Sequence, residues 1–94
     1  MVAQPLASDE MSADAALRAL LADVLGLPAD RVATFDRDTE MFGALPEFDS
    51  MAVAHLLTGI EERFELIIED DEVEAEDFMS YGRLIAFVGR LTNR

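Results

Sequence analysis

Three kinds of residue are missing or scarce in this sequence of 94 residues: it has no cysteine, no lysine and one histidine. Without cysteine the chain has no disulfide, no thiolate metal ligand and no thiol nucleophile, so any thiol chemistry must come from outside. A single histidine also gives a transition-metal site little to build on. We therefore expect no metal site, and we assign His55 no chemistry of its own.

Positive charge and long apolar runs are scarce as well. Twenty acidic residues outnumber seven arginines, and the formal net charge is -13. Such a surface repels nucleic acid and anionic lipid headgroups, and it favours partners that carry basic patches. No stretch approaches the roughly 20 apolar residues of a membrane span, and residues 1–10 lack the basic and apolar regions of a signal peptide. We expect a cytoplasmic monomer that binds no nucleic acid and does not insert into a membrane.

The apolar residues, 51% of the chain, are enough for one small core. A domain of this size leaves little room for a catalytic cleft, so we expect no enzyme. We expect residues 1–11 to form a flexible tail and residues 12–94 to form the domain. A helix is predicted over residues 13–25, with Ser12 as its N-cap and Gly26 as its stop. Its apolar residues recur at helical spacing: Leu17, Leu20, Leu21 and Val24.

Two further helices are predicted from the same spacing. The helix after Asp49 carries one apolar stripe, formed by Val53, Leu56, Leu57, Ile60 and Phe64. The helix after Ser80, its N-cap, carries Leu84, Phe87, Val88 and Leu91. A short helix is expected within residues 73–78, and no segment alternates as a strand does. The predicted fold is all-α, a four-helix bundle of three longer helices and one short helix.

The connection over residues 26–48 is long for so small a bundle. It contains two prolines and two glycines among scattered apolar residues. Four of these apolar residues are predicted to anchor the loop on the core: Phe35, Met41, Phe42 and Leu45. We therefore expect an ordered loop, and its length indicates a function.

Ser50 stands where this loop gives way to a helix. A hydrolase nucleophile is not predicted, because no glycines flank the serine and His55 is five residues away. The simplest interpretation is that Asp49 and Ser50 are both capping residues. Since Asp49 can cap the helix alone, the alternative is that Ser50 keeps a free hydroxyl at a positively polarised helix end, where a phosphate is favoured.

The triplet Asp49-Ser50-Met51, opening a helix that ends in "GIEERFELII", resembles the phosphopantetheine attachment site of the acyl carrier protein family. The similarity covers residues 12–91, where "VLGLPADRV", a long loop, "LPEFDSM" and "YGRLIAFV" follow in the family's order. The resemblance implies a non-catalytic four-helix bundle whose Ser50 receives 4'-phosphopantetheine from coenzyme A. The thiol of that arm would carry an acyl or aminoacyl group as a thioester. Asp49 would help to hold the metal of the transferase.

The same resemblance implies the partners. These are a phosphopantetheinyl transferase, a ligase that activates an acyl group or an amino acid, and acyltransferases or condensing enzymes with basic docking patches. The pathway would be fatty acid, polyketide or specialised lipid biosynthesis. The part of the helix expected to face these partners consists of Met51, Ala52, His55, Thr58 and Glu62.

The sequence also departs from the family pattern. Ala52 and His55 stand where many fatty-acid carriers have acidic residues, Phe48 where glycine or alanine is frequent, and Met51 where leucine is frequent. Asp-Ser-Met is also familiar from D-alanyl carrier proteins, which favours a dedicated carrier for a specialised pathway. Three aromatic residues are predicted to be core and, in a carrier, to line the interior that an acyl chain enters: Phe64, Phe78 and Phe87.

Two other functions compete with the carrier. One is an adaptor with the same helical fold that is never modified. The other is a calcium sensor, since Asp36, Asp38 and Glu40 occupy positions one, three and five of a calcium-loop pattern. We reject the calcium loop because Met41 replaces the required glycine and Pro46 interrupts the end. The acidic run over residues 69–77 lacks that glycine too and predicts a solvated face.

Overall fold

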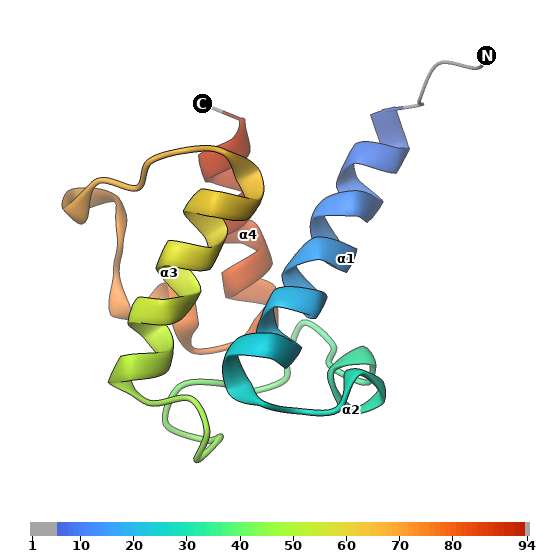
Figure 1. The fold of residues 1–94 in the computed structure, drawn as a ribbon, viewed down its shortest axis with the longest axis vertical. Helices are drawn as coiled ribbons and strands as arrows, with labels where there is room; N and C mark the ends of the chain where they lie inside the picture. Colours follow the sequence, from blue (N-terminus) through green and yellow to red (C-terminus); the bar gives the residue numbers. More distant parts are fainter. Residues whose placement is uncertain (1–5, 94) are drawn as a thin grey trace.

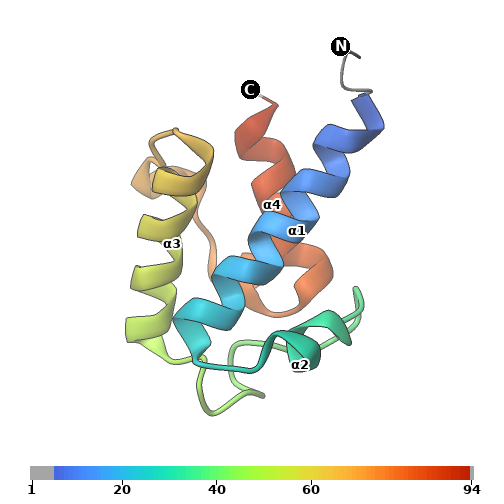
Figure 2. The ribbon, with the colours of Figure 1, turned by 45° about the vertical axis from the view of Figure 1, so that its right-hand side comes forward.

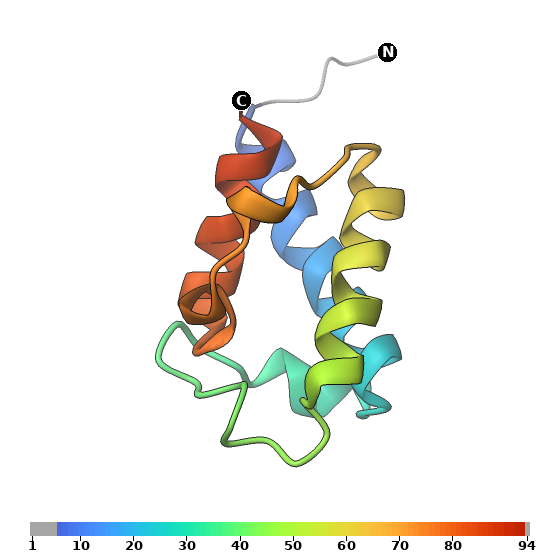
Figure 3. The ribbon, with the colours of Figure 1, turned by 90° about the vertical axis from the view of Figure 1, so that its left-hand side faces the viewer.

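The computed structural model describes the backbone of residues 6–93 and the side chains of residues 13–93. Within this range lie four α-helices, α1 (Leu6–Leu25), α2 (Ala29–Ala33), α3 (Ser50–Phe64) and α4 (Tyr81–Thr92), and two 3₁₀ turns, η1 (Asp70–Glu72) and η2 (Ala75–Phe78). α3 and α4 run opposite to α1, and the loop that contains α2 closes one end (Figures 1 and 3). The described residues form no strand, so the predicted all-α bundle of three longer helices and one short helix is confirmed.

α1 is longer than the sequence predicted. It begins at Leu6, so Ser12 lies inside the helix and is not its N-cap. No glycine or proline interrupts the sequence from Leu6 to Leu25, so nothing in the backbone ends the helix at Ser12. Residues 6–11 are therefore helical and not irregular. Residues 1–5 lie outside the described residues, and the flexibility of the tail remains a prediction.

The short helix lies elsewhere than predicted. α2 directly follows Pro28, within the long loop. The helix predicted over residues 73–78 is instead the single 3₁₀ turn η2. Acidic side chains that accept nearby backbone N–H groups favour such turns over a continuous helix. Here Asp77 accepts the N–H of Glu74 at 3.0 Å.

The core draws on all three long helices and on the loop. The predicted residues of α4 are buried, as are Leu56 and Ile60 of α3. In α1, Leu17, Leu20 and Leu21 are buried, and Val24 is partly buried. The loop anchors Phe35 and Met41 are buried and Phe42 and Leu45 are partly buried, which confirms the expected packing of the loop. α1 and α3 approach closely at Gly59, because an added Cβ would lie 2.5 Å from a methyl carbon of Leu20.

Backbone hydrogen bonds attach the long loop to the end of η2 and the start of α4, at a contact that we call the loop junction. Gly82 is needed there, because a Cβ at this position would lie 2.7 Å from the carbonyl oxygen of Arg37. Four N–H groups donate across the loop junction at 2.9–3.0 Å: Met41 to Met79, Phe42 to Phe78, Tyr81 to Thr39, and Gly82 to Arg37.

Arg18 of α1 holds an earlier part of the loop. Its guanidinium donates to the carbonyls of Val32 at 2.8 Å and Phe35 at 3.0 Å. The same group lies 3.0 Å from the Asp14 carboxylate and 4.5 Å from the centroid of the Tyr81 ring. α1 passes across α4 in Figure 2, with α2 beneath their lower ends, and packs against both helices. One cation therefore joins α1, the end of α2 and α4.

Tyr81 is buried in this contact, and its hydroxyl donates a hydrogen bond to Asp14. Burial raises the pKa of the Tyr81 hydroxyl well above its usual range, and the hydrogen bond to Asp14 raises the pKa further. The folded chain therefore keeps a proton that the unfolded chain releases above about pH 10.

The free energy of unfolding is expected to fall above about pH 10, at up to about 1.4 kcal/mol per pH unit, because only the unfolded chain ionises there. Tyr81 is the only tyrosine, and the chain has no lysine or cysteine that titrates nearby. Urea unfolding from about pH 9 to about pH 11 measures the slope. Tyr81→Phe should be less stable at pH 9 but should lose the slope above pH 10. If the free energy of unfolding falls equally above pH 10 in the natural chain and in Tyr81→Phe, the slope does not come from Tyr81.

Candidate functional site

Ser50 is the first residue of α3, next to the residue that caps the helix. Asp49 has an extended backbone, and its Oδ1 accepts the N–H of Ala52 at 2.9 Å. This confirms Asp49 as the cap. The Ser50 hydroxyl is exposed and makes no hydrogen bond to any residue whose side chain is described, so it takes no part in capping. Of the two interpretations of Ser50, the free hydroxyl is the one that the structure supports.

The start of α3 is electrostatically suited to a phosphate. Because Asp49 accepts the N–H of Ala52, the first-turn N–H groups of Ser50 and Met51 remain without a carbonyl partner inside the helix. These groups form the positive end of the helix dipole, beside the Ser50 hydroxyl. Glu47 is an acidic residue of the loop shortly before α3. It lies 3.8 Å from Arg31, which offsets part of the negative charge of Glu47.

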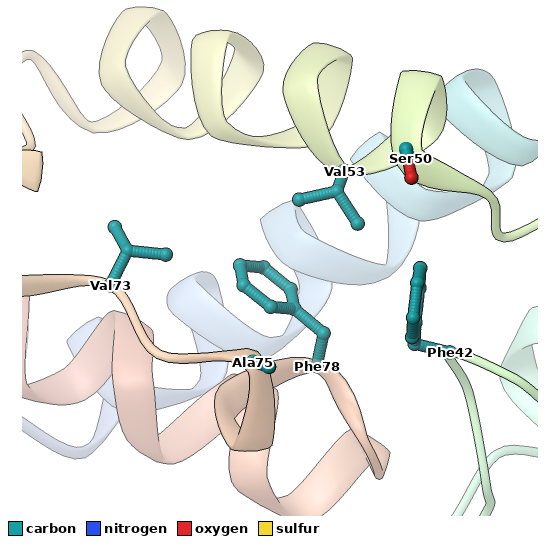
Figure 4. Close-up of a pocket in the computed structure, with 6 residues that line it drawn as sticks. All are labelled: Phe42, Ser50, Val53, Val73, Ala75 and Phe78. Atoms are coloured by element: carbon teal, nitrogen blue, oxygen red, sulfur yellow. The ribbon is translucent and has the colours of Figure 1, made fainter.

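An apolar pocket of about 240 Å³ opens beside Ser50. In Figure 4, Val53 of α3 and Phe78 face each other across the pocket, Ser50 and Phe42 lie toward one end, and Val73 lies toward the other. Ser50 is the only polar residue in the lining, which consists of Phe42, Ser50, Val53, Val73, Ala75 and Phe78. An apolar group attached near Ser50 could therefore leave water without losing a hydrogen bond.

The aromatic side of the pocket is held by the core. Phe48 is 2% exposed and lies between two lining residues, with its ring centroid 6.1 Å from that of Phe42 and 6.4 Å from that of Phe78. The ring of Phe78 is 5.9 Å from that of the buried Phe87. Phe78 and Phe87 are thus core residues as predicted, and Phe78 also lines the pocket. Phe64 is partly buried.

The prediction that Ala52 faces partner enzymes is wrong. Ala52 is only 5% exposed, and it is buried with Leu56 and Ile60 along one side of α3. These three residues recur at intervals of four, so their side chains stack on one face, and the small alanine fits the close packing of α3 on α1. The remaining expected residues are exposed: Met51, His55, Thr58 and Glu62.

Sequence reasoning missed most of the pocket. Val53 was predicted only as core, and Val73 and Ala75 stand among acidic residues with no periodic pattern. One signal in the sequence could have indicated that this segment lines the pocket: Val73 is a large apolar residue within an acidic run.

Other kinds of site find no support in the described part of the chain. Residues 13–93 contain no group of three or more His, Asp or Glu side chains arranged for a metal ion. Asp36 instead accepts hydrogen bonds from the Asp38 N–H at 2.9 Å and the Thr39 hydroxyl at 3.2 Å, which is a local turn. No helix in the described range has the length and apolar character needed to span a bilayer.

A small helical bundle with a free serine at the start of a helix, beside an apolar pocket, has the features of a carrier domain. Residues 15–89 match the family described as "Phosphopantetheine attachment site". The solution NMR structure of a holo acyl carrier protein from Nitrosomonas europaea is similar, with a TM-score of 0.72, 38% sequence identity, and coverage of 83% of this chain and 92% of that chain. A comparison with curated proteins found no significant match. The chain belongs to the acyl carrier protein family, and it is a non-catalytic carrier of covalently bound 4'-phosphopantetheine.

The cap at the start of α3 can be tested by stability. Asp49→Ala is expected to lower the free energy of unfolding by about 1 kcal/mol, because the N–H of Ala52 loses its acceptor. Asp49→Asn should change it by only a few tenths of a kcal/mol, since asparagine caps about as well. Ser50→Ala should leave it unchanged within about 0.5 kcal/mol, as at other surface positions. If urea unfolding shows a larger loss of stability for Ser50→Ala than for Asp49→Ala, then Ser50 and not Asp49 is the cap.

Proposed function

We propose that Ser50 is the residue to which phosphopantetheine is attached, and that the arm carries an apolar acyl group between enzymes of a biosynthetic pathway. The observation that supports this best is the Ser50 hydroxyl itself. It is exposed, it has no hydrogen bond within the described residues, and it lies at the capped start of α3 and at the apolar pocket.

Ser50 and its neighbours provide what attachment requires. During transfer from coenzyme A, the Ser50 oxygen forms a bond to the phosphorus next to the pantetheine while the pyrophosphate bond breaks. Adenosine 3',5'-bisphosphate leaves, and the transferase accepts the hydroxyl proton. The first-turn N–H groups of α3 then favour the phosphodiester charge. Asp49 uses one carboxylate oxygen as the cap and exposes the other, which is available to the metal of the transferase. When bound, the arm supplies the thiol that a chain without cysteine lacks.

The pocket favours an apolar acyl cargo over an aminoacyl cargo. A free ammonium group would lose its water in this lining, where Ser50 has the only side-chain acceptor, and this is costly. The pocket, of about 240 Å³ and lined almost wholly by apolar side chains, has room for part of an acyl chain.

The exposed side of α3 is the surface we propose for partner enzymes. Met51, with 65% of its surface exposed, and His55 lie near Ser50, while Thr58 and Glu62 lie further along the helix. The acids of the segment after α3 extend this surface toward partners with basic patches. These partners are a phosphopantetheinyl transferase, an acyl-activating ligase, and acyltransferases or condensing enzymes. Contacts of this kind are weak and fast, as a shuttle requires.

Attachment can be tested by intact mass. Incubation with coenzyme A and a broad-specificity phosphopantetheinyl transferase is expected to add one phosphopantetheine to the natural chain and none to Ser50→Ala. Ser80→Ala is the matched control, since Ser80 caps α4 and should not affect loading. No mass gain with several transferases, or a gain that persists in Ser50→Ala, would contradict the proposal and favour the unmodified adaptor.

The cargo can be tested with a series of acyl groups. Loading from acyl-coenzyme A of two, four, six, eight and twelve carbons should raise the unfolding temperature stepwise, because each buried methylene contributes up to about 0.8 kcal/mol. The rise should level off once the pocket is full and further methylene groups extend into solvent. An alanyl group on the same arm is the control and should give no rise. A rise that continues unchanged to twelve carbons, or one that alanyl matches, would contradict the proposed cargo.

A further inference from the structure

One wall of the pocket beside Ser50 is formed by a turn segment and not by a long helix. Val73 and Ala75 line the pocket from this segment, and Figure 4 shows them on the side opposite Val53 of α3. η2, which begins at Ala75, packs closely against α4, whereas α3 packs closely against α1. The position of the wall relative to α3 therefore depends on how this segment is attached to α4.

Asp77 shapes this segment with one carboxylate oxygen and attaches it to α4 with the other. Oδ2 accepts the N–H of Glu74 at 3.0 Å, which shapes the turn that carries Ala75. Oδ1 accepts a hydrogen bond from Nη2 of Arg90, near the end of α4, at 2.9 Å. Asp77 is 8% exposed, and among the described side chains it is the only buried charged residue. A buried carboxylate depends on its partners, so Arg90 is needed to keep this turn against α4.

Arg90 also contacts the aromatic side of the pocket. Its guanidinium carbon lies 5.7 Å from the centroid of the Phe87 ring, and this ring lies 5.9 Å from that of Phe78, which lines the pocket. The Asp77–Arg90 pair thus links α4 to the turn that carries Ala75 and, through Phe87, lies next to Phe78. Neither member of the pair lines the pocket itself.

We infer that Asp77 and Arg90 are a positioning pair, which holds the Val73 and Ala75 wall at the distance from Val53 at which the pocket accepts an acyl chain. The inference rests on the proposed function, since it requires an acyl group on the Ser50 arm to enter the pocket. Loss of the pair leaves the helices in place but lets the wall move. It therefore weakens retention of the acyl chain more than it weakens the fold.

The test compares the unfolding temperature of the holo form and the octanoyl form of each variant. Both forms are made with the same transferase, from coenzyme A or octanoyl-coenzyme A. In the natural chain octanoylation should raise the unfolding temperature. In Arg90→Gln this rise should fall by at least half, because the wall no longer closes on the chain. Arg90→Lys keeps a charged donor for Asp77 and should recover most of the rise.

Two control variants separate positioning from general destabilisation. Arg83→Gln removes the same charge from an exposed position of the same helix and should keep the full rise. Arg18→Met removes the contacts between α1, the loop and α4, so it should lower both forms equally and also keep the rise. The inference is overturned if Arg90→Gln lowers both forms equally, or if Arg83→Gln reduces the rise as much as Arg90→Gln does.

Intact mass, measured before each unfolding experiment, distinguishes the failure of this inference from that of the proposed function. A natural chain that takes no phosphopantetheine overturns the proposed function and the inference with it. A loaded natural chain without any rise on octanoylation overturns the pocket as the acyl site. A loaded chain with a rise that Arg90→Gln leaves unchanged overturns the positioning pair alone.

Discussion

The rest of the structure depends on how the long connection between α1 and α3 satisfies its backbone polar groups. A loop that packs on a core removes its N–H and C=O groups from water, and each unpaired group is costly. Arg18 bonds two carbonyls at the end of α2, and four backbone hydrogen bonds pair residues 37–42 with residues 78–82. Because these bonds reach α1 and the start of α4, the loop is fixed at both ends and behaves as part of the bundle.

The same attachment builds the candidate site. The loop junction places Phe42 beside Phe78 through the hydrogen bond between their backbones, and the ring of Phe48 packs between their rings. The loop then delivers Asp49 to the start of α3, where its carboxylate caps the helix and leaves Ser50 free. A free hydroxyl, a positive helix end and an apolar pocket therefore meet at one point because one loop is held in place.

The sequence predicted what apolar periodicity and local capping control. The structure confirms three kinds of prediction: the stripe of α4, the caps Asp49 and Ser80, and the loop anchors Phe35 and Met41. Each of these signals is local, because a cap bonds its own helix and a stripe repeats every three or four residues.

The errors arose where distant partners decide the outcome. The sequence does not reveal that Ala52 is buried, because an alanine is compatible with either side of a helix. The acidic run over residues 69–77 predicts a solvated face, but its Asp77 is buried because the fold brings it to Arg90. The contact of Arg18 with the carbonyl of Val32 likewise joins residues far apart in the sequence. Similarly, the pocket wall at Val73 depends on the path of a segment without any period.

In the proposed function, α3 separates two tasks that the carrier performs at Ser50. Met51 and His55 are exposed, whereas Val53 lines the pocket and Leu56 belongs to the buried face of the helix. Residues at successive positions of a helix point in different directions, so a partner enzyme on the exposed face need not displace a group held beside Val53. The wall opposite Val53 is tied by Asp77 to α4 and not to α3. If the cargo is held there as proposed, holding the cargo and binding the partner fall to different elements, and movement of the wall is a route by which a partner can release the cargo.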